Sequence, residues 1–521
     1  MIYLDNAATT YPKSESVYQA LDYANREYAF NAGRGSYEKA RIATEIIDTT
    51  KKQIKELCHA AENSSVIFTP SITIAINQIL QGIDFRNGDN IYYSPYEHNA
   101  VARTLHLIQK KVDVNLIEMP IVENTLEIDV EKLKYEFSIN PPRCVCSIHI
   151  SNVTGYVLPI DKIFECAKRY DAITVLDTAQ SLGVEGVDMS MMNISFLAFA
   201  GHKSLYGPLG IGGFIDSKQI KLKEIMAGGT GSSSLILDMP TESPGKYEFA
   251  STNIVAISGL SQALKEIDTD NLKEEQKLVN RLVDGLSKIE DVIIYNPRTE
   301  VHRNIVSFNL SKYKAEELGT ILDDDFRIAV RTGYHCAPFI HMDLFAQHTP
   351  GVYIDNSSLG RYEGLKGVEE FFVKFHELLD GDKKGSLCIH PITTEMLEIA
   401  RDGRTARGLW NSPGMETRVS NTTGKLEAYW VWGKYLVDFI KEDGVWKFWH
   451  FYITDHFQCD YHTAWTEKDE VKGEVLDNPL IPPADGPSQY PGTVYTSTHI
   501  EELVPPLPEH YETLDEAWTK Q

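Results

Sequence analysis

Short apolar segments alternate with amphipathic helical patterns through the first 340 residues, and this alternation limits the fold more than any other feature of the chain. Apolar strands separated by amphipathic helices predict a mostly parallel sheet with helices on both faces. In such a sheet, ligands bind beyond the carboxyl ends of the strands. The predicted strands are residues 65–69, 90–93, 144–150, 172–176 and 195–199, and the predicted helices include 37–59, 72–82, 97–110 and 160–169.

The pattern changes near residue 341. Residues 365–380 carry apolar side chains at helical spacing, and long segments of strand-like alternation follow them. A helix followed by an antiparallel sheet predicts a second domain of the α+β class. The predicted strands of this domain are 393–400, 404–411, 427–440 and 445–454, with a hairpin turn at 441–444. The expected domains are residues 1–341, residues 342–465 and a proline-rich, acidic, extended tail at 466–521.

Length, charge and cysteine content narrow the class of protein. A chain of 521 residues predicts about three domains. The net charge of −24 argues against a nucleic-acid partner, because binding to phosphates needs clustered lysine and arginine. The seven cysteines are scattered, with no spacing typical of disulfides or of a metal site, and no export signal or membrane-spanning apolar run is visible. We therefore expect a cytoplasmic protein with no metal and no membrane association.

Residues 199–213 hold the most informative motif, in which Lys203 lies between an apolar run and a glycine-rich turn. This setting suits a lysine that is held still and partly desolvated. Such a lysine has a lowered pKa and attacks carbonyl groups to form a Schiff base. A surface lysine in a loop is the alternative for an isolated His-Lys pair.

Other polar side chains follow the ends of neighbouring predicted strands, so we expect them at the same edge of the sheet as Lys203. Asp177 closes one strand, where a buried carboxylate could keep a heteroaromatic nitrogen protonated. Each of these residues alone has a structural alternative, such as a helix cap or a turn. Together they predict a phosphate site at a helix N-terminus, a stacking partner, a pyridinium partner and a Schiff-base lysine, the set that pyridoxal phosphate needs. The others are Ser71 and Thr73, His98, and His149 and Asn152.

Nine collinear stretches within residues 1–340 resemble the class V aminotransferase family and, within it, the cysteine desulfurase and selenocysteine lyase branch. They are LDNAATT at 4–10, NAGRGSYEKA at 31–40, FTPSITIAIN at 68–77, EHNAV at 97–101, HISNVTG at 149–155, LDTAQSLG at 176–183, GHKSLYGPLGIGG at 201–213, YEFASTN at 247–253 and RTGYHCAP at 331–338.

The resemblance implies the pyridoxal-phosphate transferase fold, with a large domain and an incomplete small domain, and a role for each site residue. Lys203 would carry the cofactor as an internal aldimine and move protons. Cys336 would be the nucleophile that takes sulfur and becomes a persulfide, and an inert buried thiol is the alternative. A homodimer, a cysteine-like substrate containing sulfur or selenium, and a sulfur-accepting protein are also implied. The other cofactor contacts would be Asp177 at the pyridine nitrogen, His98 on the ring, Asn152 and Gln180 at the ring oxygen, Thr73 and His202 at the phosphate, and Ser251 at the phosphate of the partner subunit.

Two departures from the family pattern stand out. Ala200 occupies the position where the family usually has a serine or threonine bonded to the phosphate. The segment that supplies the family's arginine for the substrate carboxylate is also missing, because the sequence after residue 341 has a different character. A bidentate arginine positions the substrate as well as binding it. Arg361 is a stand-in by chemistry alone.

Residues 343–465 resemble the nuclear transport factor 2-like, or SnoaL-like, superfamily, a cone of curved sheet and helices around a pocket. The matching stretches are 360–379, 402–414 and 429–457. This superfamily includes enzymes and binding modules, so the fold does not settle the function. The helices that begin such a fold are missing or reduced to residues 342–348, so we expect a fusion junction near residue 341. The candidate pocket residues are Trp432, His390, His450 and Tyr435, with ordinary core packing as the alternative.

Three hypotheses follow from these patterns. The favoured one is a pyridoxal-phosphate-dependent cysteine desulfurase. The second is a domain that binds the cofactor without turnover, joined to a C-terminal domain that acts on a small apolar ligand. The third is another reaction of the same cofactor, such as transamination or β-elimination. Replacing Cys336 separates the first from the third, and replacing Lys203 by alanine leaves only the second.

Overall fold

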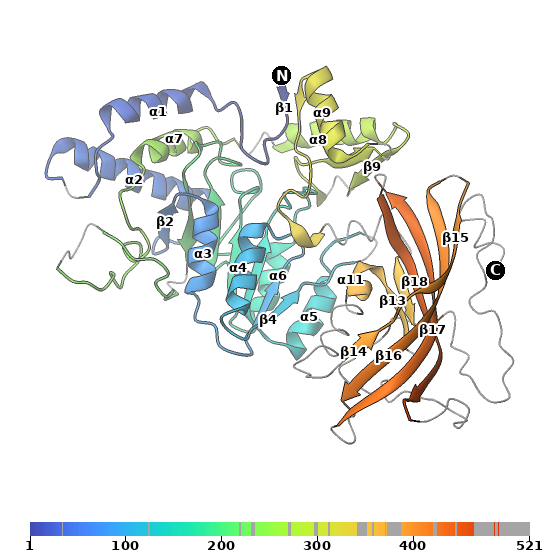
Figure 1. The fold of residues 1–521 in the computed structure, drawn as a ribbon. Helices are drawn as coiled ribbons and strands as arrows, with labels where there is room; N and C mark the ends of the chain where they lie inside the picture. Colours follow the sequence, from blue (N-terminus) through green and yellow to red (C-terminus); the bar gives the residue numbers. More distant parts are fainter. Residues whose placement is uncertain are drawn as a thin grey trace. The chain divides into compact units, whose positions relative to one another are not determined.

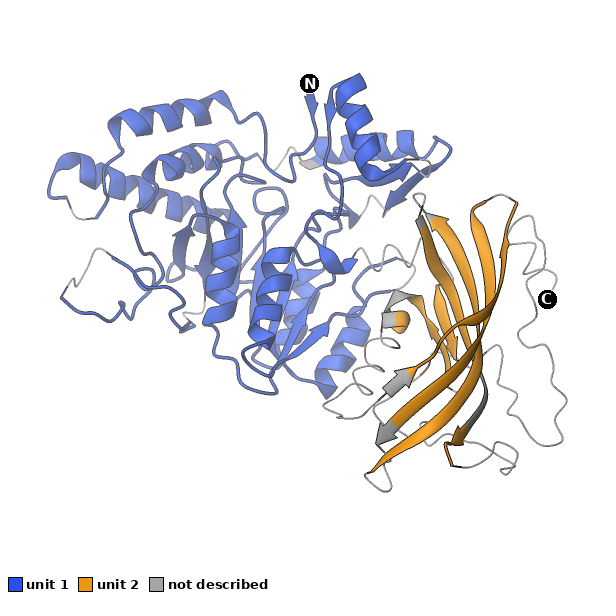
Figure 2. Ribbon diagram, in the orientation of Figure 1, with its two compact units in different colours: residues 1–341 blue, residues 342–521 orange. Residues whose placement is uncertain are grey.

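A computed structural model describes most of the chain up to residue 462 and, after that, only residues 484 and 488. It divides into two compact units, residues 1–341 and residues 342–521 (Figure 2). The predicted tail and the predicted helix remnant at 342–348 lie outside the described residues. Before residue 462, the residues not described are 34, 123–124, 218–219, 231–234, 269–271, 296–300, 311–312, 341–351, 357–358, 370, 372–386, 402, 420–424 and 443–444.

A seven-stranded sheet forms the centre of the first unit (Figure 1). Only β8 runs antiparallel to its neighbours, so the prediction of a mostly parallel sheet is confirmed. The strand order is β2 (Ser65–Thr69), β8 (Gly212–Asp216), β7 (Phe196–Ala200), β6 (Ile173–Asp177), β5 (Pro142–Ile148), β3 (Asn90–Tyr93) and β4 (Asn115–Glu118).

Helices cover this sheet because its central strands are apolar on both faces. All five residues of β7 are buried, which is typical of a strand with cover on both sides. Helix α3 packs against β7 and β8, and α6 packs against β5 and β6. The described helices of this unit are α1 (Glu15–Glu27), α2 (Glu38–Leu57), α3 (Ile72–Gly82), α4 (Asn99–Gln109), α5 (Val130–Ile139), α6 (Ile160–Lys168), α7 (Ile254–Leu264), α8 (Leu272–Leu286) and α9 (Ala315–Phe326).

Strand β8 begins at Gly212, within the stretch 199–213 that the sequence pattern assigned to a glycine-rich turn, and it was not predicted. Gly213 faces the neighbouring strand so closely that a Cβ atom there would lie 2.2 Å from the carbonyl oxygen of Ile67 in β2. The glycine is needed for packing between strands, and its presence hides the strand from a composition-based prediction.

Two short strand pairs complete the first unit. Strand β1 (Ile2–Tyr3) pairs in parallel with β11 (Ile328–Ala329), and β9 (Val292–Tyr295) pairs with β10 (Ser307–Leu310). The first pair brings the two ends of this unit's sequence side by side. It therefore carries the residues that follow each strand to the same place.

The second unit is built on a curved sheet in which only β12 and β18 pair in parallel (Figure 1). This sheet confirms the predicted antiparallel character, although its three long strands extend beyond the predicted ranges. Part of the predicted helix at 365–380 lies outside the described residues. The elements are β12 (Tyr353–Asn356), β13 (Gly360–Glu363), α11 (Gly364–Glu369), β14 (Leu387–Ile389), β15 (Thr393–Ile399), β16 (Thr405–Val419), β17 (Leu426–Glu442) and β18 (Val445–Asp460), in the sheet order β13-β12-β18-β17-β16-β14, with β15 also on β16.

The two faces of this sheet differ in chemistry. On one face, Ile354, Tyr362 and Phe371 form an apolar cluster against which Val368 of α11 packs. The opposite face, which we call the polar face, carries Asp438 paired in register with His450, beside an apolar cluster of Tyr353, Leu409, Leu436 and Tyr452. Asp438 and His450 are buried on this face, so they must find partners within the protein.

Candidate active site

The carboxyl ends of β6 and β7 bring Asp177 and Lys203 to the same edge of the first sheet. Asp177 is the last residue of β6, and Lys203 follows the end of the adjacent parallel strand β7 by three residues. Asp177 is only 3% exposed, and its Oδ1 accepts a hydrogen bond from the backbone N–H of Ala179 at 2.8 Å. The structure thus brings together the two groups that the sequence placed at this edge.

The Lys203 side chain is partly buried, and burial lowers its pKa because the charged ammonium is desolvated. The carboxylate of Asp177 opposes this shift, and the charge of Arg331 adds to it. The backbone around Lys203 is fixed by the N-terminal segment. Thr10 Oγ1 donates to the carbonyl oxygen of Lys203 at 2.7 Å, and Thr9 Oγ1 donates to that of His202 at 3.1 Å.

His98 is the N-cap residue of α4, directly after the loop that follows β3. Its Nδ1 accepts a hydrogen bond from the N–H of Ala100 at 3.0 Å. Burial lowers the pKa of His98 to about 4, and the charges of Lys203 and Arg331 act in the same direction. The ring is therefore neutral at pH 7 and carries its proton on Nε2.

Glu97, the neighbour of His98, was not predicted as a functional residue. Its Oε1 accepts hydrogen bonds from Ser94 Oγ at 2.5 Å and from the N–H of Ile148 at 2.7 Å. Burial raises its pKa to about 8. Glu97 thus connects the loop before His98 to the end of β5. Nothing in the EHNAV stretch of the sequence indicates that Glu97 is buried, so it could not be distinguished from a surface glutamate.

The N-terminus of α3 is the predicted phosphate site. Ser71 caps this helix and accepts from the N–H of Ile74 at 3.4 Å, while Thr73 is exposed. Within the described part of the chain, Nδ1 of His202 is a buried atom without a hydrogen-bond partner. Ala200 is buried at the end of β7 and supplies no hydroxyl group.

Asn152 and Gln180 lie at the same edge but are engaged with the protein chain. Asn152 Nδ2 donates to the carbonyl oxygen of His335 at 2.7 Å, and Gln180 Nε2 donates to that of Ala7 at 2.8 Å. Oδ1 of Asn152 is buried and has no partner among the described residues. His149 is almost fully buried, and burial lowers its pKa to about 4, so its ring is neutral at pH 7.

Cys336 lies in an exposed loop that is tied to this edge at two points. Its carbonyl oxygen accepts from the N–H of Asn99 at 2.7 Å, and the preceding residue, His335, is held by Asn152. Cys336 has a φ of +57°, an uncommon conformation for a residue with a side chain. Among the six cysteines whose side chains are described, it alone is exposed, so the alternative of a buried thiol is wrong.

Arg331 and Asp5 form an ion pair that the sequence patterns did not single out. Arg331 Nη1 lies 3.7 Å from Asp5 Oδ2, and each residue lies two positions after the end of its strand, Asp5 after β1 and Arg331 after β11. Both belong to stretches that resemble the family, but their separation in the chain hid the pairing.

Two other predicted residues take no part in this cluster. Ser251 is exposed. Arg361, the stand-in for the missing arginine, lies on β13 of the second unit, where its Nη2 contacts Glu363 Oε1 at 2.6 Å. Arg361 is thus engaged within its own unit.

The second unit holds a buried network of charges. Asp438 is fully buried between Arg407, whose Nε donates to Oδ1 at 2.6 Å, and His450, whose Nδ1 contacts Oδ2 at 2.8 Å. Burial acts to raise the pKa of Asp438, but hydrogen bonds from His450 and Arg407 outweigh it, and the pKa is lowered. The ring of Tyr353 stacks on that of His450 with centroids 4.4 Å apart.

The four residues predicted for a C-terminal pocket do not converge. His450 and Trp432 share the polar face, whereas Tyr435 lies on the other face against Phe451, with ring centroids 5.5 Å apart. His390 pairs with Glu416 at 2.7 Å. The sequence found one member of the Arg407–Asp438–His450 network and missed the others, because register across three strands brings them together.

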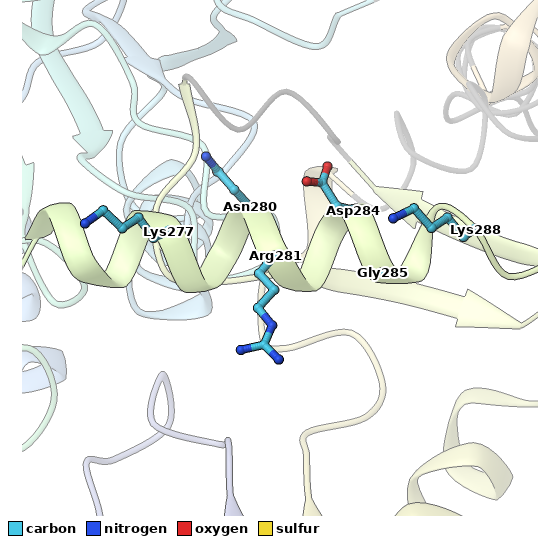
Figure 3. Close-up of a pocket in the computed structure, with 6 residues that line it drawn as sticks. All are labelled: Lys277, Asn280, Arg281, Asp284, Gly285 and Lys288. Carbon is cyan, nitrogen blue, oxygen red and sulfur yellow. The ribbon is translucent and has the colours of Figure 1, made fainter.

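A shallow pocket elsewhere in the first unit is unrelated to these residues (Figure 3). It runs along α8, and Arg281 points away from Asn280 and Asp284. All of its lining residues belong to or follow this one helix: Lys277, Asn280, Arg281, Asp284, Gly285 and Lys288.

The edge of the first sheet fits a cofactor that has an anionic group and a basic ring nitrogen. Nδ1 of His202 and Oδ1 of Asn152 are buried polar atoms without protein partners in the described structure, and buried polar atoms require partners. Asp177 supplies a buried carboxyl group, and Lys203 supplies an amine of lowered pKa. The residues present therefore suit pyridoxal phosphate.

Comparison with known families gives two matches. The family described as aminotransferase class-V matches residues 2–371, and a SnoaL-like domain matches residues 342–452. The two matches overlap at residues 342–371, which in the structure belong to the second unit. The resemblances stated from the sequence are both confirmed.

Individual relatives match most of the chain. The chain is 30% identical to a probable cysteine desulfurase of Pyrococcus abyssi, over 73% of this chain and 94% of that protein. It is 32% identical to a probable cysteine desulfurase of Halalkalibacterium halodurans, over 71% and 94%. A solved apo structure of cysteine desulfurase from Thermococcus onnurineus matches with a TM-score of 0.61 and 27% identity, over 73% of this chain and 95% of that one.

No helix in the described part of the chain is long and apolar enough to cross a bilayer.

Proposed function

The chain belongs to the class V aminotransferase family, and from this premise we propose that its first unit is a pyridoxal-phosphate-dependent cysteine desulfurase. One observation carries the proposal. Asp177 ends β6, Lys203 follows the end of the neighbouring parallel strand β7, and the loop of the exposed Cys336 is tied to the same sheet edge. An accessible thiol at the same sheet edge as a lysine of lowered pKa is an arrangement suited to sulfur transfer from an amino acid.

Bound pyridoxal phosphate supplies an electron sink for bonds at the α-carbon of an amino acid. In our proposal Lys203 holds it covalently, Asp177 pairs with its ring nitrogen and His98 lies against its ring. Asn152 and Gln180 contact its ring oxygen. Its phosphate is held by Ser71, Thr73 and His202, and by Ser251 of the partner subunit in a homodimer.

In this proposal Lys203 and Cys336 have different roles in the reaction. Lys203 Nζ accepts and returns protons, a task suited to an amine whose pKa burial has lowered. The thiolate of Cys336 attacks the sulfur of the substrate cysteine. An S–S bond forms as the C–S bond of the substrate breaks, and the electron pair left on carbon takes a proton. The products are free alanine and a persulfide on Cys336.

The exposure of Cys336 supports delivery of this sulfur to another protein. A persulfide on an exposed loop is accessible to an acceptor thiol, whereas the other described cysteines are buried. We therefore include a sulfur-accepting partner in the proposal. We also include a cytoplasmic setting, which the scattered cysteines without disulfide spacing support.

The test measures the visible absorbance of the full-length protein and its release of sulfide from L-cysteine in the presence of a reductant. The wild type is expected to show both the cofactor band and sulfide release. Cys336→Ser should keep the band and lose sulfide release, and Lys203→Ala should lose both. Cys166→Ala, which changes a buried cysteine in α6, serves as the control. Sulfide release that persists in Cys336→Ser would refute the proposed role of the thiol.

A further inference from the structure

An amino-acid substrate carries an α-carboxylate, and a cationic side chain in the site must bind it. This inference rests on the proposed function. The sequence lacks the family's usual arginine segment, and Arg361 is paired with Glu363 in the second unit. An uncompensated carboxylate in a partly desolvated site is costly, so another cation of the first unit must take this part.

The paired strands β1 and β11 present one arginine beside the site. Their parallel register places Ile2 opposite Ile328 and Tyr3 opposite Ala329. Asp5 and Arg331 lie just beyond, with their charged atoms 3.7 Å apart. This is a loose pair, and the side chain of Arg331 remains 47% exposed, so the guanidinium is accessible to a second carboxylate.

The segment after β1 is tied to the lysine side of the site. Thr9 and Thr10, which follow Asp5, donate hydrogen bonds to the carbonyl oxygens of His202 and Lys203. The backbone carbonyl oxygen of Asp5 accepts a hydrogen bond from the N–H of Ala8 at 3.1 Å. The chain between Asp5 and Thr10 is thus a short, bonded turn.

The segment after β11 is tied to the opposite side. Four and five residues after Arg331, the carbonyl oxygens of His335 and Cys336 accept hydrogen bonds from Asn152 and Asn99. Arg331 therefore stands between the backbone that holds Lys203 and the loop that holds the thiol. Its charge also contributes to lowering the pKa of both Lys203 and His98, as expected for a cation at this position.

We propose that Arg331 binds the α-carboxylate of the amino-acid substrate, and that Asp5 is its partner when no substrate is bound. The guanidinium presents a fork of N–H groups that matches a carboxylate. Two other cations near this edge are already engaged. Lys13 donates to the carbonyl oxygen of His202 at 3.0 Å, and Arg303 contacts Glu185 at 2.5 Å.

Three substitutions test separately the charge of Arg331, the bidentate geometry of its guanidinium and the competition of Asp5 with the substrate carboxylate. Arg331→Ala should weaken binding of L-cysteine by about 10- to 100-fold, the effect of losing a charge-assisted contact. Arg331→Lys should give an intermediate loss, because lysine keeps the charge without the bidentate geometry. Asp5→Asn should strengthen binding by about two- to fivefold, since it removes the competing carboxylate of a half-exposed pair.

The experiment titrates the cofactor-loaded, full-length variants with L-cysteine and with cysteamine, which lacks the carboxylate, and follows the visible absorbance of the bound cofactor. The affinity for cysteamine should be the same in the wild type and in Arg331→Ala. The affinity for L-cysteine should be lower in Arg331→Ala than in the wild type. The matched control is Arg26→Ala, which breaks an exposed arginine–aspartate pair on α1 with Asp22. This control should change neither titration.

Equal weakening of both ligands in Arg331→Ala would show a structural effect and overturn the inference, as would unchanged binding of L-cysteine. Failure of the proposed function gives a different result. In that case the wild type releases no sulfide, yet it still prefers L-cysteine to cysteamine in a manner that depends on Arg331.

Discussion

Replacing Asp438 by asparagine is expected to destabilise the second unit strongly and leave the first unit unchanged. The Asp438 carboxylate is fully buried and holds the cationic side chain of Arg407, through contacts of 2.6 and 3.3 Å, and the ring of His450, through a contact of 2.8 Å. An asparagine amide of the same shape keeps the volume but loses the charge. Arg407, whose side chain is only 12% exposed, would then be a nearly buried cation without its carboxylate.

Breaking a buried ion pair by removing one partner costs about 3–5 kcal/mol. With a urea m value of about 2 kcal/mol/M, this cost lowers the unfolding midpoint by about 1.5–2.5 M. Substitution at an exposed pair costs about 0–1 kcal/mol. Glu363→Gln, which alters the partly exposed pair with Arg361, is therefore the matched control.

Tryptophan fluorescence measures this effect in the second unit alone, because all seven tryptophans lie at residue 410 or later. The first unit is followed in the same samples by the visible absorbance of its bound cofactor. A fluorescence midpoint that falls by less than about 0.5 M, or by no more than in the Glu363→Gln control, would refute the argument from burial.

The same variant gives a pH test of the charge. Hydrogen bonds from His450 and Arg407 lower the pKa of Asp438 in the folded protein. The resulting stabilisation is fully present above the pKa of an unfolded aspartate, about 3.9, and is lost as the pH falls through the lower, folded pKa. The wild type should therefore exceed Asp438→Asn in stability at pH 7, and the difference should shrink below pH 4.

Three further predictions concern the first unit. Glu97→Gln should be more stable than the wild type at pH 8 but not at pH 5. Burial raises the pKa of Glu97 in the folded protein to about 8, whereas a glutamate in the unfolded chain has a pKa of about 4.3. The wild type therefore loses stability as the pH rises between these two values. Thermal unfolding measures this, and curves that stay parallel across the range would contradict it. Asn152→Ala should release the loop of Cys336 and raise amide hydrogen exchange at residues 333–338 by about tenfold, the effect of losing one hydrogen bond of about 1.4 kcal/mol; unchanged exchange would show that the bond does not hold the loop. His98 should show no protonation between pH 5.5 and 8, because burial lowers its pKa to about 4; an imidazole NMR signal that titrates near pH 6.5 and disappears in His98→Gln would be the contrary result.

The position of the first site followed from the sequence because parallel strands put their carboxyl ends at one edge. The apolar runs at 65–69 and 90–93 correspond to β2 and β3 residue for residue, and the helix at 72–82 corresponds to α3. Asp177 and Lys203 could be placed together once their strands were identified, since neighbouring parallel strands need no knowledge of side-chain detail. Hydrophobic runs bounded by turns carry that information locally.

Contacts set by register between long strands could not be predicted in the same way. Arg407, Asp438 and His450 belong to three strands, and a shift of one residue in either pairing would turn one of them to the opposite face. Strand β18 also contains two irregularities in its pairing with β17, one of them beside Asp438. Alternation alone does not locate such irregularities, so the sequence identified His450 as a candidate without its partners.

The first site also depends on a segment that has almost no secondary structure of its own. Strand β1 is two residues long, yet the ten residues at the N-terminus contact three separate parts of the unit. They pair with β11, they donate through Thr9 and Thr10 to the backbone of His202 and Lys203, and they accept Gln180 at the carbonyl of Ala7. Each bond joins residues about 170 or more positions apart, so none is visible as a local pattern. Because the same segment carries Asp5, the partner of Arg331, the chain that fixes the lysine also sets where the substrate carboxylate is met.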